Sequence, residues 1–165
     1  LDRMVYPWNF SPMMVLCLFA GAHFARRELA CLCPLLILLV SDALIGLLSG
    51  SIHNAFYQHT PIVYGSFVAG TCIGFLLRGE RTAWHIGGSA LAAQILFFLV
   101  TNFGVWAGTG MYTPDFSGLM TCYIAALPFF RNSLIALAVF TPIAFSHWAL
   151  LPKLDPAPAM VATDA

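Results

Sequence analysis

Long apolar runs, separated only by short clusters of charge, are the feature that most limits what this chain can fold into. Of its 165 residues, 60% are hydrophobic and only 8% are charged, and the mean hydropathy is +0.85. A soluble domain carries about a quarter charged residues, because its surface must be hydrated. Seven Lys and Arg with seven Asp and Glu cannot cover such a surface. We therefore expect an all-α integral membrane protein in contact with the lipid bilayer.

Charged and turn residues divide the chain into six apolar segments. A helix needs about 20 apolar residues to cross roughly 30 Å of hydrocarbon, so the first and fifth segments are marginal. The pattern predicts one polytopic transmembrane bundle of about six short helices, with four spans and two re-entrant pieces as the alternative. The expected spans are residues 12–25, 28–48, 59–77, 82–107, 116–130 and 132–151, followed by a tail over 152–165.

The positions of Lys and Arg predict an orientation for this bundle. If all six segments span, five arginines lie in loops on one side, and only Arg3 and Lys153 lie on the other. Loops on the cytoplasmic side are enriched in Lys and Arg. We therefore expect the arginine-bearing loops in the cytoplasm and both termini outside. The five arginines are Arg26, Arg27, Arg78, Arg81 and Arg131.

Small residues at helical spacing indicate where helices pack closely. Lipid does not drive helices together, so tight contact depends on side chains that let backbones approach. Gly70 and Gly74 form such a strip on the third segment, and Gly88 begins one on the fourth. This spacing predicts close helix packing without specifying a partner.

Asp42 is the strongest candidate for a functional residue. It lies well inside the second segment, where a carboxylate is costly unless it faces the bundle interior, a partner group or a water-filled cavity. It could bind a cationic group of a substrate or carry a proton. Equally, it could be a hydrogen-bonded carboxyl that fixes helix packing, with Ser41 as a neighbour.

A second set of candidates lies near the end of the fourth segment. Asn102 and Trp106 are four residues apart and so share one helical face. With Tyr112 and Asp115 from the following loop, they could line an outward-facing pocket. The alternative is that Trp106 anchors the helix at the membrane interface and Asn102 marks the helix end.

Other classes of chemistry find no support in the sequence. The five histidines lack helical metal-site spacing, and the five cysteines form no CxxC motif, so neither a metal nor a cofactor is expected. No phosphate-binding loop or catalytic signature is present, and we expect no enzyme activity. The net charge of zero gives no indication of a nucleic-acid partner.

Five strings carry a resemblance: Asn9-Phe-Ser-Pro12, Leu18-Phe-Ala-Gly-Ala-His-Phe24, Pro34 to Asp42, Phe97-Phe-Leu-Val-Thr-Asn-Phe-Gly-Val-Trp106 and Cys122-Tyr-Ile-Ala-Ala-Leu-Pro-Phe-Phe-Arg-Asn132. They resemble an uncharacterised bacterial family of six-helix membrane proteins, which are usually labelled as transport proteins. That family is grouped loosely with the substrate-binding S components of energy-coupling factor transporters, which are small bundles of about six helices. The resemblance implies a bacterial inner-membrane, multi-pass protein that binds a small ligand near its outer side. It also implies partner contact through small residues of the first helix, here Gly21 and Ala25.

Two functions therefore remain open at the level of sequence. The first is a transport-type membrane protein that binds a small ligand around Asp42, Asn102, Trp106 and Tyr112. The second is a non-catalytic accessory subunit packed into a larger assembly with other membrane subunits. The sequence does not identify the ligand.

Overall fold

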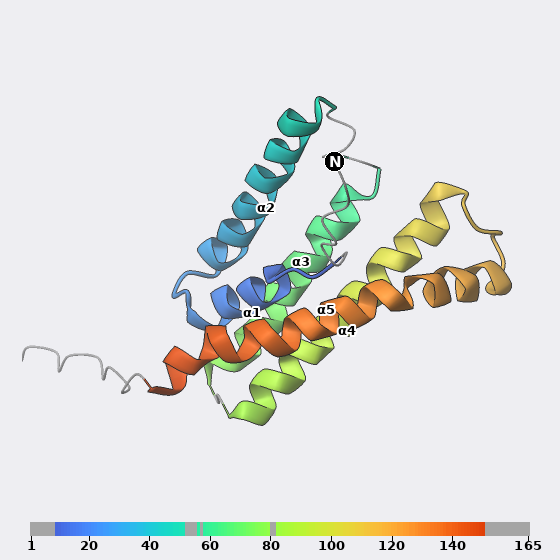
Figure 1. Cartoon of the computed structure of the whole chain (residues 1–165). Helices are drawn as coiled ribbons and strands as arrows, with labels where there is room; N and C mark the ends of the chain where they lie inside the picture. The colour runs from blue at the N-terminus through green and yellow to red at the C-terminus, as the bar shows by residue number, and fades with distance from the viewer. Residues whose placement is uncertain (1–8, 52–55, 57, 80–81, 151–165) are drawn as a thin grey trace, which may run out of the picture.

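The computed structural model describes residues 9–51, 56, 58–79 and 82–150, with side chains as far as Ser146. This part of the chain forms five α-helices (Figure 1). They are α1 (Met13–His23), α2 (Arg27–Ser49), α3 (Thr60–Gly74), α4 (Ala83–Thr109) and α5 (Phe116–Leu150), and a 3₁₀ turn, η2 (Phe75–Arg78), continues α3. The all-α class is as expected.

The prediction of six helices is wrong, because the fifth and sixth segments form one helix. The 35-residue α5 continues through Arg131 and Asn132, which were expected to end a span. Arginine is a good helix former, so a charged pair alone does not break a helix. At the standard rise α5 is about 52 Å long, more than the roughly 30 Å of a bilayer core, so it crosses at a tilt, extends beyond the hydrocarbon, or both.

Four helical segments are long and apolar enough to cross a membrane: Arg27–Ser49, Thr60–Arg78, Ala83–Thr109 and Phe116–Ser146. The remaining helix, α1, has only 11 residues. At the standard rise it extends about 16 Å, roughly half of the hydrocarbon thickness. The described residues thus form four candidate spans and one short helix.

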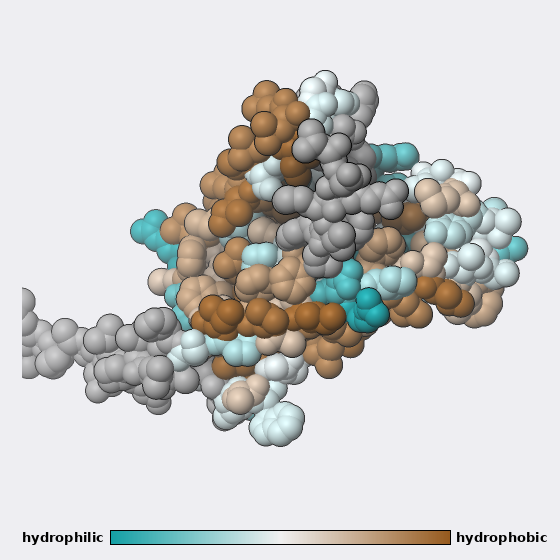
Figure 2. Space-filling view, viewed as in Figure 1, coloured by the Kyte–Doolittle hydropathy of each residue, from teal (hydrophilic) through white to brown (hydrophobic). Residues whose placement is uncertain are grey.

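The short helix α1 lies at the centre of the bundle (Figure 1). Seven of its residues are buried, against only Ala30 and Pro34 in α2. It contributes Met14, Val15, Cys17, Leu18 and Ala22 to the hydrophobic core, where α3, α4 and α5 pack against it. Apolar side chains cover the visible face of α2, the surface a lipid-facing helix requires (Figure 2).

Glycines allow α1 and α3 to pack in very close, parallel contact. A Cβ atom on Gly74 would lie 2.5 Å from the carbonyl oxygen of Leu18, and one on Gly21 would meet the backbone of Thr71. Gly70 packs against the end of the Met14 side chain. The Gly70–Gly74 strip therefore has its partner within the chain, as small-residue packing in membranes requires. Gly88 has open space around it, and Ala25 is exposed in the turn after α1.

Three of the four arginines in the described part of the chain lie at one end of the bundle, which we call the arginine end (Arg26, Arg27 and Arg78). Arg78 fixes this end by donating from Nε to the carbonyl of Gly21 (2.9 Å) and from Nη2 to that of Phe24 (2.8 Å). Phe145, near the end of α5, packs on Phe19 and His23 of α1. The chain therefore reaches the arginine end again at the end of α5.

This path changes the side of the bundle on which the last helix is expected to end. With four spans, α5 ends on the same side as the start of α2. The connections at the opposite end, residues 50–59 and 110–115, contain no Lys or Arg. Arg131 lies inside α5 and not in a loop. The expected placement of the C-terminus opposite the arginines depended on six spans, whereas here α5 ends on the side of the arginines; the expected tail over 152–165 lies outside the described residues.

Candidate ligand-binding cavity

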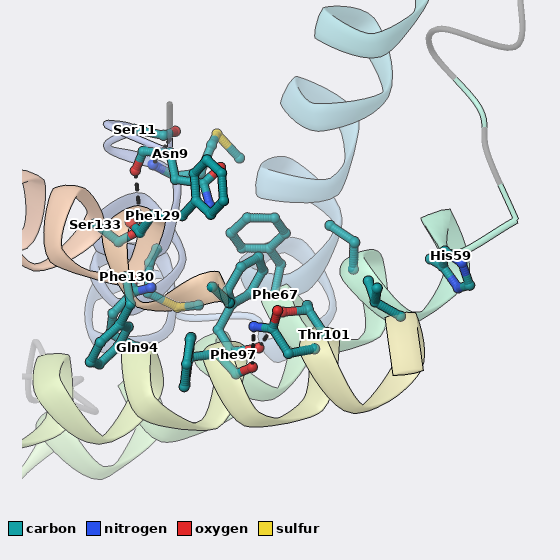
Figure 3. Close-up of a pocket in the computed structure, with 17 residues that line it drawn as sticks. Asn9, Ser11, His59, Phe67, Gln94, Phe97, Thr101, Phe129, Phe130 and Ser133 are labelled. Atoms are coloured by element: carbon teal, nitrogen blue, oxygen red, sulfur yellow. Dashed lines mark hydrogen bonds between the residues drawn. The ribbon is translucent and has the colours of Figure 1, made fainter. Parts of the chain in front are cut away.

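A cavity of about 350 Å³ lies between the start of α1 and helices α3, α4 and α5 (Figure 3). Cavities of 300–1,000 Å³ that are largely apolar, with a few convergent polar groups, are typical small-molecule sites. Its polar lining consists of Asn9, Ser11, His59, Gln94, Thr101, Asn102 and Ser133. Its aromatic lining consists of Phe67, Phe97, Phe98, Phe129 and Phe130.

Helix α4 supplies the longest wall of the cavity. Gln94, Phe97, Phe98, Thr101 and Asn102 recur at intervals of three or four residues, which places them on one helical face. At the standard rise, Gln94 and Thr101 are separated by about 10 Å along the axis. The wall is therefore aromatic in the middle and polar at both ends.

The hydrogen bonds along this wall differ between its two ends. Thr101 donates its hydroxyl to the carbonyl of Phe97 (2.7 Å), and Asn102 donates from Nδ2 to that of Phe98 (2.8 Å). Gln94 is only 6% exposed, and its side chain has no hydrogen-bond partner among the described residues. Buried amides are nearly always paired, so Gln94 is the polar group in this cavity that most requires a partner.

Phenylalanine rings form the sides of the cavity. The rings of Phe67 and Phe97 lie 4.9 Å apart between centroids, and those of Phe98 and Phe130 lie 4.5 Å apart. Aromatic pairs at these distances stabilise each other beyond their buried area. The rings are held by contacts between helices, so the apolar surface is largely preformed.

The segment before α1 closes one side of the cavity. Ser133 of α5 donates its hydroxyl to the carbonyl of Asn9 (3.1 Å), which joins residues 124 positions apart. Asn9 adopts a left-handed conformation (φ 63°), which asparagine tolerates better than most residues. The hydroxyl of Ser11 accepts from the amide of Met13 (3.3 Å) at the first turn of α1.

The structure separates the four residues predicted to bind a ligand. Asn102 lines the cavity, but Asp42 lies between α2 and α3, where the hydroxyl of Tyr64 donates to its Oδ2 (2.7 Å). Trp106 donates from Nε1 to the carbonyl of Thr113 (2.9 Å) and so holds the turn between α4 and α5. Tyr112 is half-buried in that turn and does not line the cavity.

Gln94 was not singled out in the sequence, although a signal for it exists. It is the one amide within an otherwise apolar stretch of α4, and it lies seven residues before Thr101 on the same face. Asn9 and Ser133 gave no comparable signal, because their contact depends on how α5 crosses α1.

A second hollow lies between α4 and α5 near the arginine end. Its volume is about 610 Å³, and its polar side chains are only Thr141 and Ser146. Among the described residues, no group of three or more His, Cys, Asp or Glu could hold a metal ion. The second hollow has only two hydroxyl groups to orient a ligand, whereas the cavity with Gln94 has amide, imidazole and hydroxyl groups, and we take that cavity as the candidate site.

Asp115 stabilises the start of α5, and this gives a pH-dependent prediction. Its Oδ1 accepts from the amide of Gly118 (2.7 Å) and the hydroxyl of Thr113 (2.9 Å), which lowers its pKa below the usual 3.8. A lowered pKa stabilises the folded state above the ordinary value, and this contribution is lost as the pH falls through the folded pKa. We expect hydrogen-exchange protection of the Gly118 amide to fall below about pH 4.

The control for this prediction is Asp115→Asn, which keeps the shape of the side chain but cannot titrate. Protection of Gly118 in this variant should not change between pH 5 and pH 3. A matching fall in protection in both proteins would show that Asp115 is not the responsible group.

Four candidate spans make this chain a multi-pass helical membrane protein. The chain belongs to a family of unknown function, DUF6580, whose family model matches residues 1–160. Comparison with curated proteins and with solved structures gave no match.

Proposed function

We propose that the protein binds a small molecule within the membrane, as the substrate-binding part of a transport system. The observation that carries this proposal is the 350 Å³ cavity, in which amide and hydroxyl groups converge between phenylalanine rings. Its size and mixed lining are those of ligand sites. The resemblance to S components of energy-coupling factor transporters supports a transport role and the bacterial inner membrane as the location.

Filling the cavity tests this proposal. Ala126 lines the cavity and is 8% exposed, whereas its neighbour Ala125 is exposed and lies outside the lining. Ala126→Phe should occupy the ligand volume, and Ala125→Phe should add the same ring on the lipid-facing side. The protein is purified from its native membrane in lipid nanodiscs, and retained small molecules are identified by liquid chromatography and mass spectrometry.

We expect the wild type and Ala125→Phe to retain the same compound, and Ala126→Phe to have lost it. Thermal unfolding, followed by tryptophan fluorescence, shows whether each variant remains folded. If the three proteins retain the same set of compounds, the proposed binding function is wrong.

The orientation gives a further prediction. We expect the arginine end to face the cytoplasm, because the opposite connections have no Lys or Arg. Alkaline phosphatase, which is active only outside the cytoplasm, should be inactive when fused after Gly79 and active when fused after Gly110. The reverse pattern would contradict the proposed orientation.

The accessory-subunit function has one observation in its favour. Only Ala30 and Pro34 are buried along the 23 residues of α2, so this helix offers a large apolar face to lipid or to another membrane protein. Native mass spectrometry of the protein from its own membrane distinguishes the two. A lone chain would argue against the accessory subunit, and a second chain in fixed ratio with no retained small molecule would favour it.

A further inference from the structure

We infer that the ligand is an uncharged, planar molecule with an N–H donor next to a C=O acceptor along one edge, and that this edge pairs with the Gln94 side chain. The inference rests on the proposed binding function and specifies the class of molecule. Lactams and cyclic imides of aromatic rings are the simplest examples.

The lining of the cavity disfavours a charged ligand. None of its 17 residues is Asp, Glu, Lys or Arg. The intramembrane carboxylate, Asp42, is engaged by Tyr64 outside the cavity, and Arg131 lies on the exposed side of α5. Apart from the imidazole of His59, the lining offers no group that could balance the charge of an ionic ligand, and burying an unbalanced charge is strongly unfavourable in a membrane interior.

Gln94 determines the polar edge of the ligand. A primary amide presents an N–H donor and a carbonyl acceptor side by side. The Gln94 side chain is 94% buried, lines the cavity and lacks a partner among the described residues (Figure 3). A ligand with an adjacent donor and acceptor would satisfy both groups of this amide at once, whereas a ligand with either alone would leave one unpaired.

The aromatic walls determine the shape of the ligand. Phe97 and Phe98 follow Gln94 by about one helical turn, and Phe67 and Phe130 pack against them. A flat ring that pairs with Gln94 would extend along these rings, where aromatic contacts favour planar surfaces. Further along, Asn102 uses Nδ2 on the Phe98 carbonyl, which leaves its Oδ1 as an acceptor for a donor on the ligand.

Four probes separate these requirements. The first, 2-quinolone, is neutral and planar, with adjacent N–H and C=O groups. The others are 1-methyl-2-quinolone, which lacks the donor, naphthalene, which lacks both groups, and quinoline-2-carboxylate, which is charged. Each is titrated against the protein in nanodiscs, and binding is measured by equilibrium dialysis for the wild type and two variants.

The variants are Gln94→Leu and a matched control, Gln58→Leu. Gln58 is exposed and lies outside the cavity, so its replacement removes the same amide elsewhere. We expect the wild type and Gln58→Leu to bind 2-quinolone at least tenfold more tightly than the other three probes. Gln94→Leu should lose this preference and bind 2-quinolone and naphthalene equally.

Two results would overturn the inference while leaving the binding function intact. One is the tightest binding for the carboxylate probe. The other is a 2-quinolone preference that Gln94→Leu does not change. Failure of the proposed function itself is recognised separately, because Ala126→Phe would then retain the same compounds and bind the same probes as the wild type.

Discussion

Replacing Gly74 with alanine is expected to lower the free energy of unfolding by about 2–3 kcal/mol. The new Cβ would lie 2.5 Å from the carbonyl oxygen of Leu18 and 3.0 Å from its Cα. Both are backbone atoms, so α1 and α3 would have to move apart. Alanine favours the helix over glycine by less than about 1 kcal/mol, which does not offset this clash.

Gly88→Ala is the matched control for this prediction. It lies within a helix, as Gly74 does, but nothing lies within 4 Å of its Cβ position. Its unfolding free energy should be unchanged or slightly higher. Both variants are measured by reversible denaturation in mixed micelles. Equal stability of Gly74→Ala and the wild type would show that α1 and α3 are not in the close contact described here.

Arg78→Ala should give the second largest loss of stability, about 2 kcal/mol. The last turn of a helix leaves carbonyl groups without partners inside the helix, and a cation is favourable there. Arg78 supplies such a cation at the end of α1, where it donates hydrogen bonds to the carbonyls of Gly21 and Phe24. Its guanidinium also lies 4.6 Å from the centre of the Phe75 ring. Alanine would leave the two carbonyls partly buried and unpaired.

Arg27 is a useful comparison for Arg78, because it lies at the same end and faces the same ring. Its guanidinium is 5.7 Å from the centre of Phe75, and the side chain is exposed. Arg27→Ala should change the unfolding free energy by no more than about 0.5 kcal/mol. If both arginines contribute equally, the charge at this end matters and the two hydrogen bonds of Arg78 do not.

The long apolar runs and their turn residues carried most of the information about the helices. Gly50 and Gly110 adopt left-handed conformations directly after α2 and α4, where glycine ends a helix at low cost. The pair Arg26 and Arg27 likewise lies where α2 begins, after the turn that follows α1. Local sequence of this kind acts on the backbone directly, so it can be interpreted without the fold.

The continuity of α5 could not be predicted in the same way. Pro128 and the Arg131–Asn132 pair both resemble the end of a span, yet the helix passes through them. Neighbouring helices in a membrane can satisfy backbone groups that a proline leaves unpaired. This compensation depends on tertiary contacts, which the order of residues does not display.

The candidate site was predicted only in part for a similar reason. Asn102 was identified because an amide near Trp106 is conspicuous in an apolar run. Asp42 attracted attention by its charge, but its partner Tyr64 lies 22 residues away on another helix. The cavity itself arises from the crossing of α5 over α1 and α4, and hydropathy patterns contain no information about that crossing.

The most direct test of the central claim, a ligand-binding cavity inside the bundle, is a native mass spectrum of the protein released from nanodiscs. The wild type and Ala125→Phe should each show one bound small molecule per chain in addition to the 17.9 kDa protein. Ala126→Phe, with the cavity filled, should show the protein alone. Bare protein in all three spectra, or the same bound mass in all three, would contradict the account.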